Sequence, residues 1–173
     1  MERDAVEEDF TAYVRARRET LVRAVVLLGC SVPEAEDLVQ TALVRCYRSW
    51  GRVLAADDSD AYVFRVLFNC VNSSRSRRWV NERPTELVPV EDDGARRAID
   101  RAATGLAVRA ALNRLSLAHR SVLVLRYLVD LSERQIAEVL DLPTGTVKSR
   151  TARALDALAQ DPALRDLDLE GVL

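Results

Sequence analysis

The sequence predicts an all-α protein of two small helical domains joined by a flexible linker. Almost every segment outside residues 83–104 repeats its apolar residues at helical spacing, and few segments alternate as strands do. Residues 131–158 have the pattern of a complete helix-turn-helix. The pattern breaks at 83–104, which contains prolines, an acidic run and a glycine. We therefore expect domains at residues 1–82 and 105–160, a linker at 83–104 and an acidic tail at 161–173.

The first clear helix of the N-terminal domain is predicted to begin at Pro33 and Glu34 and to continue to about Trp50. Tyr47 and Trp50 are expected in the core. The apolar stripe, at alternating steps of four and three, consists of Val39, Leu43, Cys46 and Trp50. The opposite face carries Asp37, Gln40, Thr41 and Arg48. Taken alone, this polar face fits either solvated surface or a binding surface.

The next helix is predicted to begin near residues 58–60, whose aspartate and serine side chains are good N-caps. It continues into a polar stretch and then a cationic one. Candidate nucleic-acid contacts there are Asn69, Asn72, Ser73, Arg75, Arg77 and Arg78. Arginines on phosphates, with asparagine and serine on base edges or an unstacked base, are typical of nucleic-acid recognition. A run of charge is more often simply a solvated face, so both interpretations stay open here.

Two segments flank the C-terminal domain. The first half of the linker contains Pro84 and Pro89, and a short helix is expected from about Ala95. The tail after Gln160 is acidic and is expected to fray or to dock loosely.

The helix-turn-helix has its own start signal. Ser132 is placed to cap the first helix, and Gln135 to return the hydrogen bond of a capping box. Leu131 can staple onto Ile136, and the helix is expected to end at about Leu140. Asp-Leu-Pro follows as a tight turn, because aspartate tolerates the left-handed conformation and proline is accepted near the start of a helix.

The second helix of this unit is predicted to bury Val147, Thr151, Leu155 and Leu158. Its outer face is small, polar and cationic. The candidate DNA contacts on and beside that face are Thr146, Lys148, Ser149, Arg150 and Arg153. A short helix with such a face fits a DNA major groove, whereas the alternative is an ordinary helical hairpin.

The total charge limits how the protein can bind DNA. With a formal net charge of −2, the chain should bind free DNA weakly, since phosphate neutralisation supplies most non-specific affinity. This favours a protein that a partner delivers to DNA. No apolar run is long enough to span a membrane, and the acidic start differs from a signal peptide. We expect a cytoplasmic protein without membrane insertion.

Composition also argues against a catalytic or metal site. Cys30, Cys46 and Cys70 are widely separated, and His119 is the one histidine, so no zinc cluster is expected. Each cysteine is expected to be a small buried hydrophobe. The sequence has no nucleophile with a paired base and no phosphate-binding glycine loop. We expect neither an enzyme nor a cofactor.

Four stretches, in this order, resemble extracytoplasmic-function (ECF) RNA polymerase sigma factors of the compact, SigE-like kind found in actinobacteria. They are AEDLVQTALVRCYRSW (35–50), DAYVFRVLFNCVNSSRSRRW (60–79), LSLAHRSVLVLRYLVDLSERQIAEVL (115–140) and PTGTVKSRTARAL (143–155). The resemblance covers most of both domains.

The resemblance implies a role for each set of candidates. The helix of residues 35–50 would bind the clamp helices of core RNA polymerase, with Asp37, Gln40 and Thr41 as contacts. Residues 60–79 would recognise and open the promoter −10 element, and the last helix of the helix-turn-helix would recognise the −35 element. The polymerase flap, promoter DNA and an anti-sigma factor are the other partners implied, and the linker would replace the central domain of larger sigma factors.

Two other functions remain as hypotheses at this point. A stand-alone helix-turn-helix regulator would bind its operator tightly without polymerase, usually as a dimer. A sigma-like decoy would sequester an anti-sigma protein without recognising DNA, but its DNA-binding surfaces should then be degraded. Two cationic sets argue against a decoy, namely Arg75, Arg77 and Arg78, and Lys148, Arg150 and Arg153.

Overall fold

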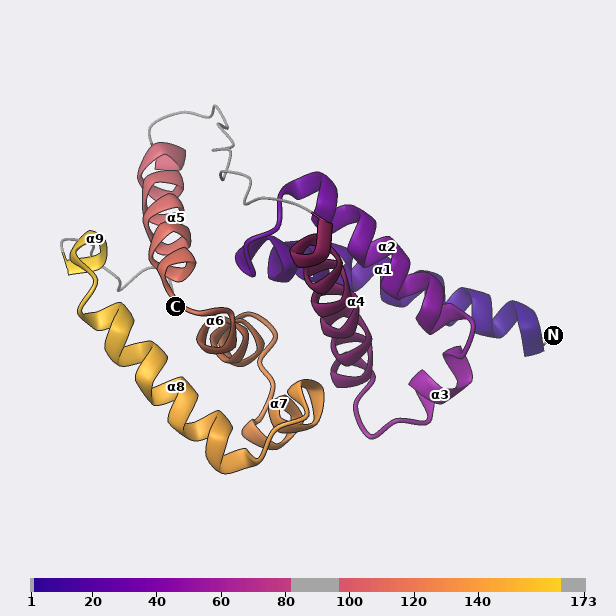
Figure 1. Ribbon diagram of the computed structural model, residues 1–173. Coiled ribbons are helices and arrows are strands. Elements are labelled where there is room, and N and C mark those ends of the chain that lie inside the picture. The colour runs from indigo at the N-terminus through magenta and orange to yellow at the C-terminus, as the bar shows by residue number, and fades with distance from the viewer. Residues whose placement is uncertain (1, 82–96, 166–173) are drawn as a thin grey trace.

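The computed structural model describes residues 2–81 and 97–165, and these form helices and short connections without a strand (Figure 1). This confirms the all-α prediction. The N-terminal half contains α1 (Glu2–Leu27), α2 (Val32–Tyr47), α3 (Trp50–Leu54) and α4 (Ser59–Asn81). The C-terminal half contains α5 (Arg97–Arg114), α6 (Leu117–Leu123), the π-helical turn η1 (Val124–Leu128), α7 (Glu133–Leu140), α8 (Thr144–Ala159) and α9 (Pro162–Arg165).

The predicted linker lies partly outside the described residues. Nothing is described for residues 83–96, while residues 97–104 belong to α5. The start of α5 at Arg97 is close to Ala95, where the sequence predicts a short helix. α5 is longer than expected and continues without a break into the predicted C-terminal domain.

The helix predicted from Pro33 to Trp50 is two helices. A capping box starts α2, with the Ser31 N–H donating to Glu34 Oε2 at 2.9 Å. The helix ends at Tyr47 because Ser49 leaves helical geometry, with φ of −134° and ψ of 34°. Trp50 therefore begins α3, yet its side chain is buried as predicted.

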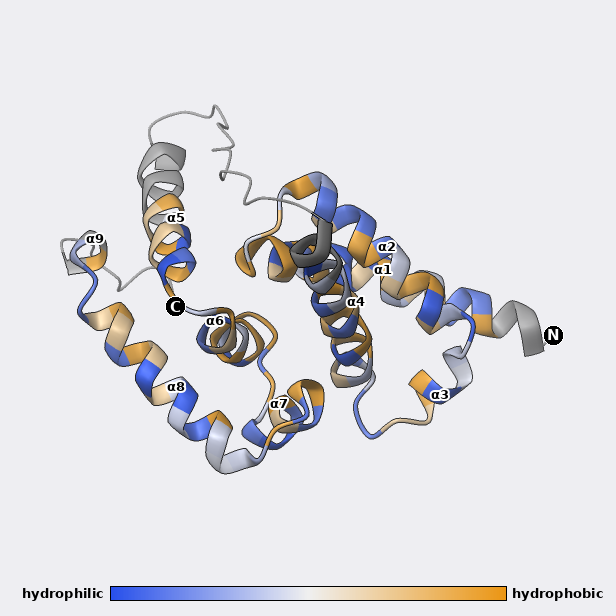
Figure 2. Ribbon diagram, viewed as in Figure 1, coloured by the Kyte–Doolittle hydropathy of each residue, from blue (hydrophilic) through white to orange (hydrophobic). Residues whose placement is uncertain are grey.

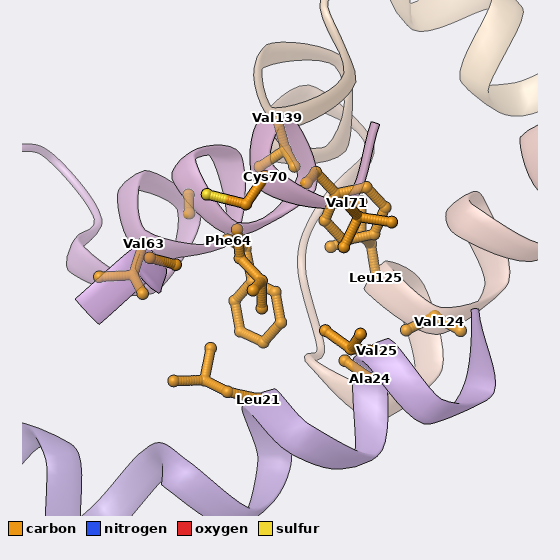
Figure 3. Close-up of a cluster of buried hydrophobic side chains, with 14 of the residues drawn as sticks. Leu21, Ala24, Val25, Val63, Phe64, Cys70, Val71, Val124, Leu125 and Val139 are labelled. Carbon is orange, nitrogen blue, oxygen red and sulfur yellow. The ribbon is translucent and has the colours of Figure 1, made fainter. Parts of the chain in front are cut away.

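α4 begins where the sequence predicts. Asp58 Oδ1 accepts a hydrogen bond from the Ala61 N–H at 2.9 Å, which satisfies one of the free donors at the helix start. Apolar side chains bury two sides of this helix. Phe64 points toward Leu21 of α1, whereas Val71 lies beside Leu125 of η1 (Figure 3).

One hydrophobic core joins the two halves of the chain. It contains buried residues of α1, α2, α3 and α4 together with residues of the C-terminal half. Figure 2 shows orange residues alternating with blue ones along these helices, as expected for helices that bury one side. The C-terminal contributors are Val122, Val124, Leu125, Leu131, Ile136, Ala137, Val139 and Val147. The two units are therefore packed against each other through burial of apolar surface.

A smaller cluster holds the C-terminal unit together and corrects one prediction. Leu112 of α5, Leu123 of α6 and Ala154 of α8 are buried in it. Leu155, predicted to be buried, is 40% exposed. At about 100° per residue, position 154 lies about 20° from the direction of Val147, whereas position 155 lies about 80° away.

The acidic tail is docked at its first residue. Asp161 is buried, and its two carboxylate oxygens accept hydrogen bonds from the Arg114 guanidinium at 2.7 and 2.5 Å. α9 then packs against α5 and α8. Residues 166–173 lie outside the described part of the chain.

Candidate nucleic-acid interface

The helix-turn-helix has the local geometry that the sequence predicts. The Ser132 N–H donates to Gln135 Oε1 at 2.8 Å, and the Gln135 N–H donates to Ser132 Oγ at 3.3 Å. Leu131 and Ile136 are both buried. α7 ends at Asp141, which adopts the left-handed conformation with φ and ψ of 55°. Every signal in this turn comes from residues a few positions apart, and buried Ile136 and Val147 then belong to the same core, so the turn and its packing hold α7 against α8.

The outer face of α8 is open to solvent. Lys148, Ser149 and Arg153 are exposed, while Thr146 and Arg150 are half-buried. Lys148 Nζ lies 3.8 Å from Glu133 Oε2, an exposed pair that contributes little stability. The face thus presents cationic and hydroxyl donors to whatever lies against it. Groups of this kind bind phosphates and the acceptor atoms of bases in a major groove.

The residues of the second candidate set, on α4, differ in their exposure and in their contacts. Asn69, Asn72 and Ser73 are exposed on the helix. Arg75 is half-buried, and its guanidinium donates to the Leu28 carbonyl at the end of α1. The side chains of Arg77 and Arg78 lie outside what the structure describes, although their backbone belongs to α4. Arg75 therefore has a partner within the protein, which sequence reasoning did not anticipate.

The third set lies on α2. Asp37, Gln40 and Thr41 are exposed and line a shallow hollow with Val44, Arg45 and Arg48. Asp37 and Gln40 also line a groove of about 550 Å³ between α1 and α2.

Sequence reasoning missed the α1 wall of this groove, which Phe10, Val14 and Arg18 form. The apolar Phe10 and Val14, four residues apart, were the available signal. The expectation that Tyr47 is a core residue is wrong. Tyr47 is 43% exposed at the groove, and its ring centroid lies 4.8 Å from that of Phe10.

The described residues contain no group of acidic, histidine or cysteine side chains that could hold a metal ion. Cys46 and Cys70 are buried and Cys30 is half-buried. Burial raises the pKa of the Cys46 thiol to about 11, so this thiol stays protonated and unreactive at neutral pH. No described helix is both long and apolar enough to cross a membrane.

Comparison with known proteins identifies the family. The family model for sigma-70 region 4 matches residues 105–158, which contain the helix-turn-helix. The RNA polymerase sigma-E factor of Streptomyces avermitilis is 37% identical over 162 residues, covering 92% of this chain and 88% of that protein. The ECF RNA polymerase sigma factor SigC of Mycobacterium tuberculosis is 31% identical and covers 90% of this chain and 84% of its own length. This chain belongs to the ECF RNA polymerase sigma factors.

Solved structures share the fold of this sigma factor. The sigma factor RpoE of Bartonella quintana, crystallised with the anti-sigma factor NepR, superposes with a TM-score of 0.70. It is 23% identical, and the match covers 88% of this chain and 95% of that one. CnrH, in complex with the cytosolic domain of CnrY, gives a TM-score of 0.62 at 23% identity. Membership of this family supports the function of a sigma factor over that of a stand-alone regulator. Sigma factors are transcription initiation factors.

Proposed function

We propose that this sigma factor binds core RNA polymerase through the outer face of α2 and places α8 on the −35 element and α4 on the −10 element. The observation that carries this proposal is the exposed outer face of α8, the second helix of a helix-turn-helix whose first helix has a complete capping box, within the region 4 match. The domain bounds proposed are 1–82 for the polymerase and −10 unit and 105–160 for the −35 unit.

Recognition of the −35 element would use duplex DNA. Ser149 and Arg153, with Thr146 on the same face, would enter the major groove, where each base pair presents a distinct pattern of donors and acceptors. Lys148 and Arg150, which flank this face, would contact the phosphate backbone and set the register.

Recognition of the −10 element would use an unpaired strand. Asn69, Asn72 and Ser73 would bind an extruded base and its neighbours, because amides and hydroxyls offer both donors and acceptors. Unstacking a base costs on the order of a few kcal/mol, which contacts to the flipped base and the phosphates must offset. The proposed phosphate contacts are Arg75, Arg77 and Arg78.

Polymerase would supply the affinity for DNA that the acidic chain lacks. A net charge of −2 disfavours binding to free DNA, whereas docking of Asp37, Gln40 and Thr41 on the clamp helices fixes both units near the promoter. A contact between the C-terminal unit and the flap would complete the complex. A cytoplasmic location, the absence of catalysis by this chain itself and control by an anti-sigma factor belong to the same proposal.

Run-off transcription with core RNA polymerase tests this function, on a promoter taken from upstream of the protein's own gene. We expect a transcript that requires the protein and is lost in Asp37→Lys, because the reversed charge meets the polymerase surface. Glu19→Lys is the matched control, since Glu19 is exposed on α1 and undergoes the same charge reversal. A transcript that survives Asp37→Lys would contradict the assignment of α2.

A further inference from the structure

Two arginines converge on the turn that joins α1 to α2. Arg75 of α4 donates to the Leu28 carbonyl at the start of this turn. Arg120 of α6 also reaches the turn, because a Cβ added at Gly29 would lie 2.6 Å from Arg120 Nη1 and 3.4 Å from Arg75 Nη2. Cys30 is the next residue and is half-buried. Its thiol is therefore carried by a segment that both guanidiniums touch.

This pair of cations has no carboxylate partner among the ion pairs that the structure describes. Arg120 is only 7% exposed, and it donates to the Asn113 side chain and to the Asn113 and Leu115 carbonyls. Its Nε–H is buried without a hydrogen-bond partner in the described part of the chain. A buried cation with an unused donor favours an anionic acceptor beside it.

The charges around Cys30 favour its thiolate form. Burial and the neighbouring Arg75 lower the pKa of Arg120, whereas a Cys30 thiolate acts in the opposite direction and stabilises the charged guanidinium. This attraction is mutual, so Arg120 stabilises the thiolate in turn. Cys30 also directly precedes Ser31, the N-cap of α2, where the helix dipole favours negative charge.

One carboxylate near Cys30 opposes this effect. Glu34 Oε2 accepts a hydrogen bond from the Ser31 N–H at 2.9 Å and so lies at the same helix start. It is exposed to solvent, which screens its charge. Two guanidiniums, one of them buried, outweigh a single exposed carboxylate.

The other two cysteines have a different environment. Cys46 and Cys70 are buried among apolar side chains of the main core. Burial, together with the neighbouring Cys70, raises the pKa of the Cys46 thiol to about 11. Because the thiolate is the reactive form, these two cysteines serve as internal controls for Cys30.

We propose that Cys30 is a peroxide-sensitive thiol, activated by Arg75, Arg120 and the start of α2. The thiolate sulfur attacks one oxygen of hydrogen peroxide, the O–O bond breaks and hydroxide leaves. The sulfur thereby forms an S–O bond and loses two electrons to the peroxide, which gives a sulfenic acid. Its oxygen offers an acceptor for the unused Nε–H of Arg120. This inference goes beyond the proposed function and does not depend on it.

Trapping of the sulfenic acid in the unmodified chain tests the proposal. The folded protein is treated with hydrogen peroxide in the presence of dimedone, freed of both reagents, and digested with trypsin for mass spectrometry. Cleavage after arginine places the three cysteines on separate peptides, which span residues 24–45, 46–48 and 66–75. We expect Cys30 to be labelled at least about tenfold faster than Cys46 and Cys70. Labelling of Cys30 at the rate of the buried cysteines, or more slowly, would overturn the proposal.

Substitution of Arg75 tests the cause of the reactivity. Alkylation of Cys30 by iodoacetamide between about pH 5 and pH 10 gives the midpoint of thiolate formation, which we expect below the ordinary value of about 8.5. Arg75→Gln should raise this midpoint and slow the reaction with peroxide. Arg75→Lys keeps the charge and should react nearly as the unmodified chain does. Arg52→Gln, at an exposed arginine of α3, is the control and should change nothing.

The outcomes distinguish charge from structure. A midpoint at or above the ordinary value in the unmodified chain would overturn the proposal, and so would an unchanged midpoint in Arg75→Gln. Equal shifts in Arg75→Gln and Arg75→Lys would assign the effect to the lost contact with the Leu28 carbonyl and would overturn activation by charge. The trapping experiment needs no substitution, so its result stands even if a variant fails to fold.

Discussion

The two helices proposed to bind DNA differ in how the protein holds them. α8 is the last helix of a locally specified turn, and its outer face contacts nothing beyond Glu133 among the described ion pairs. α4 is a central helix with two buried sides, and Arg75 on it already donates to the Leu28 carbonyl directly after α1. The helix proposed for duplex DNA is thus presented to solvent, whereas the helix proposed for an unpaired strand is also the platform for packing the other unit.

This difference suits the two tasks. Recognition of a duplex requires a rigid face that has the binding geometry before DNA arrives. A fixed angle between α7 and α8 supplies that geometry. In the proposed function, α4 captures a base from an opened duplex only after polymerase has bound. A surface used at that later stage can take part in intramolecular packing beforehand.

The largest expected effect comes from the helix that joins the two units. Ile136→Ala removes a side chain buried in the shared core and should lower the free energy of unfolding by about 2–5 kcal/mol. Urea unfolding followed by Trp50 fluorescence measures this, with Trp79 replaced by phenylalanine. Because Trp50 is in the other half of the chain, a shift of its midpoint means that the halves unfold together.

Leu155→Ala is the control for this substitution. Leu155 is exposed on α8, so its removal should change stability by less than about 0.5 kcal/mol. An Ile136→Ala variant that leaves the Trp50 transition in place would show that the two halves of the chain unfold independently.

Next in size is the loss of a base contact on α8. Arg153→Ala should weaken promoter binding by the polymerase complex by about 1–3 kcal/mol and relax specificity at one −35 position. Binding to a set of promoters with single −35 substitutions measures both effects, and Arg52→Ala on α3 is the exposed-arginine control. An equal loss on every sequence would instead assign Arg153 to a phosphate.

The smallest effect is expected on α4. Asn72→Ala removes one hydrogen-bonding side chain and should weaken the open complex by about 0.5–1.5 kcal/mol, while binding to the −35 duplex stays unchanged. Permanganate reactivity of unpaired thymines measures opening. Ser76→Ala, also exposed on α4, is the control. Loss of −35 binding in Asn72→Ala would show that α4 and α8 do not have the separate tasks proposed for them.

Local signals explain which parts of the structure the sequence could predict. The cap at Ser132, the left-handed Asp141 and the end of α7 at Leu140 depend on residues a few positions apart. The same holds for the Asp58 cap of α4 and the buried stripe of α2. The exposed candidate residues on α2 and α8 follow from the same helical periodicity.

The remaining features depend on contacts between distant segments. Arg75 and Leu28 are 47 positions apart, and Gln135 and Asp58 are 77 apart. No periodicity shows that α7 has a second apolar partner in α4, because burial in one unit and burial between two units leave the same pattern. The wrong prediction at Leu155 has a different cause. From Val147 to Leu155 the predicted stripe advanced four residues at each step, and this spacing moves steadily away from the helical repeat of 3.6 residues.

Gly29 shows how this architecture restricts the sequence far from any DNA or polymerase surface. Its φ of +97° is a conformation that other residues rarely adopt, and an added Cβ would lie 2.6 Å from Arg120 Nη1. Three hydrogen bonds hold that guanidinium in place, so it cannot easily withdraw. Position 29 should therefore tolerate almost no replacement in a saturation mutagenesis screen, and a pathway of substitutions that changes promoter preference must leave this residue untouched.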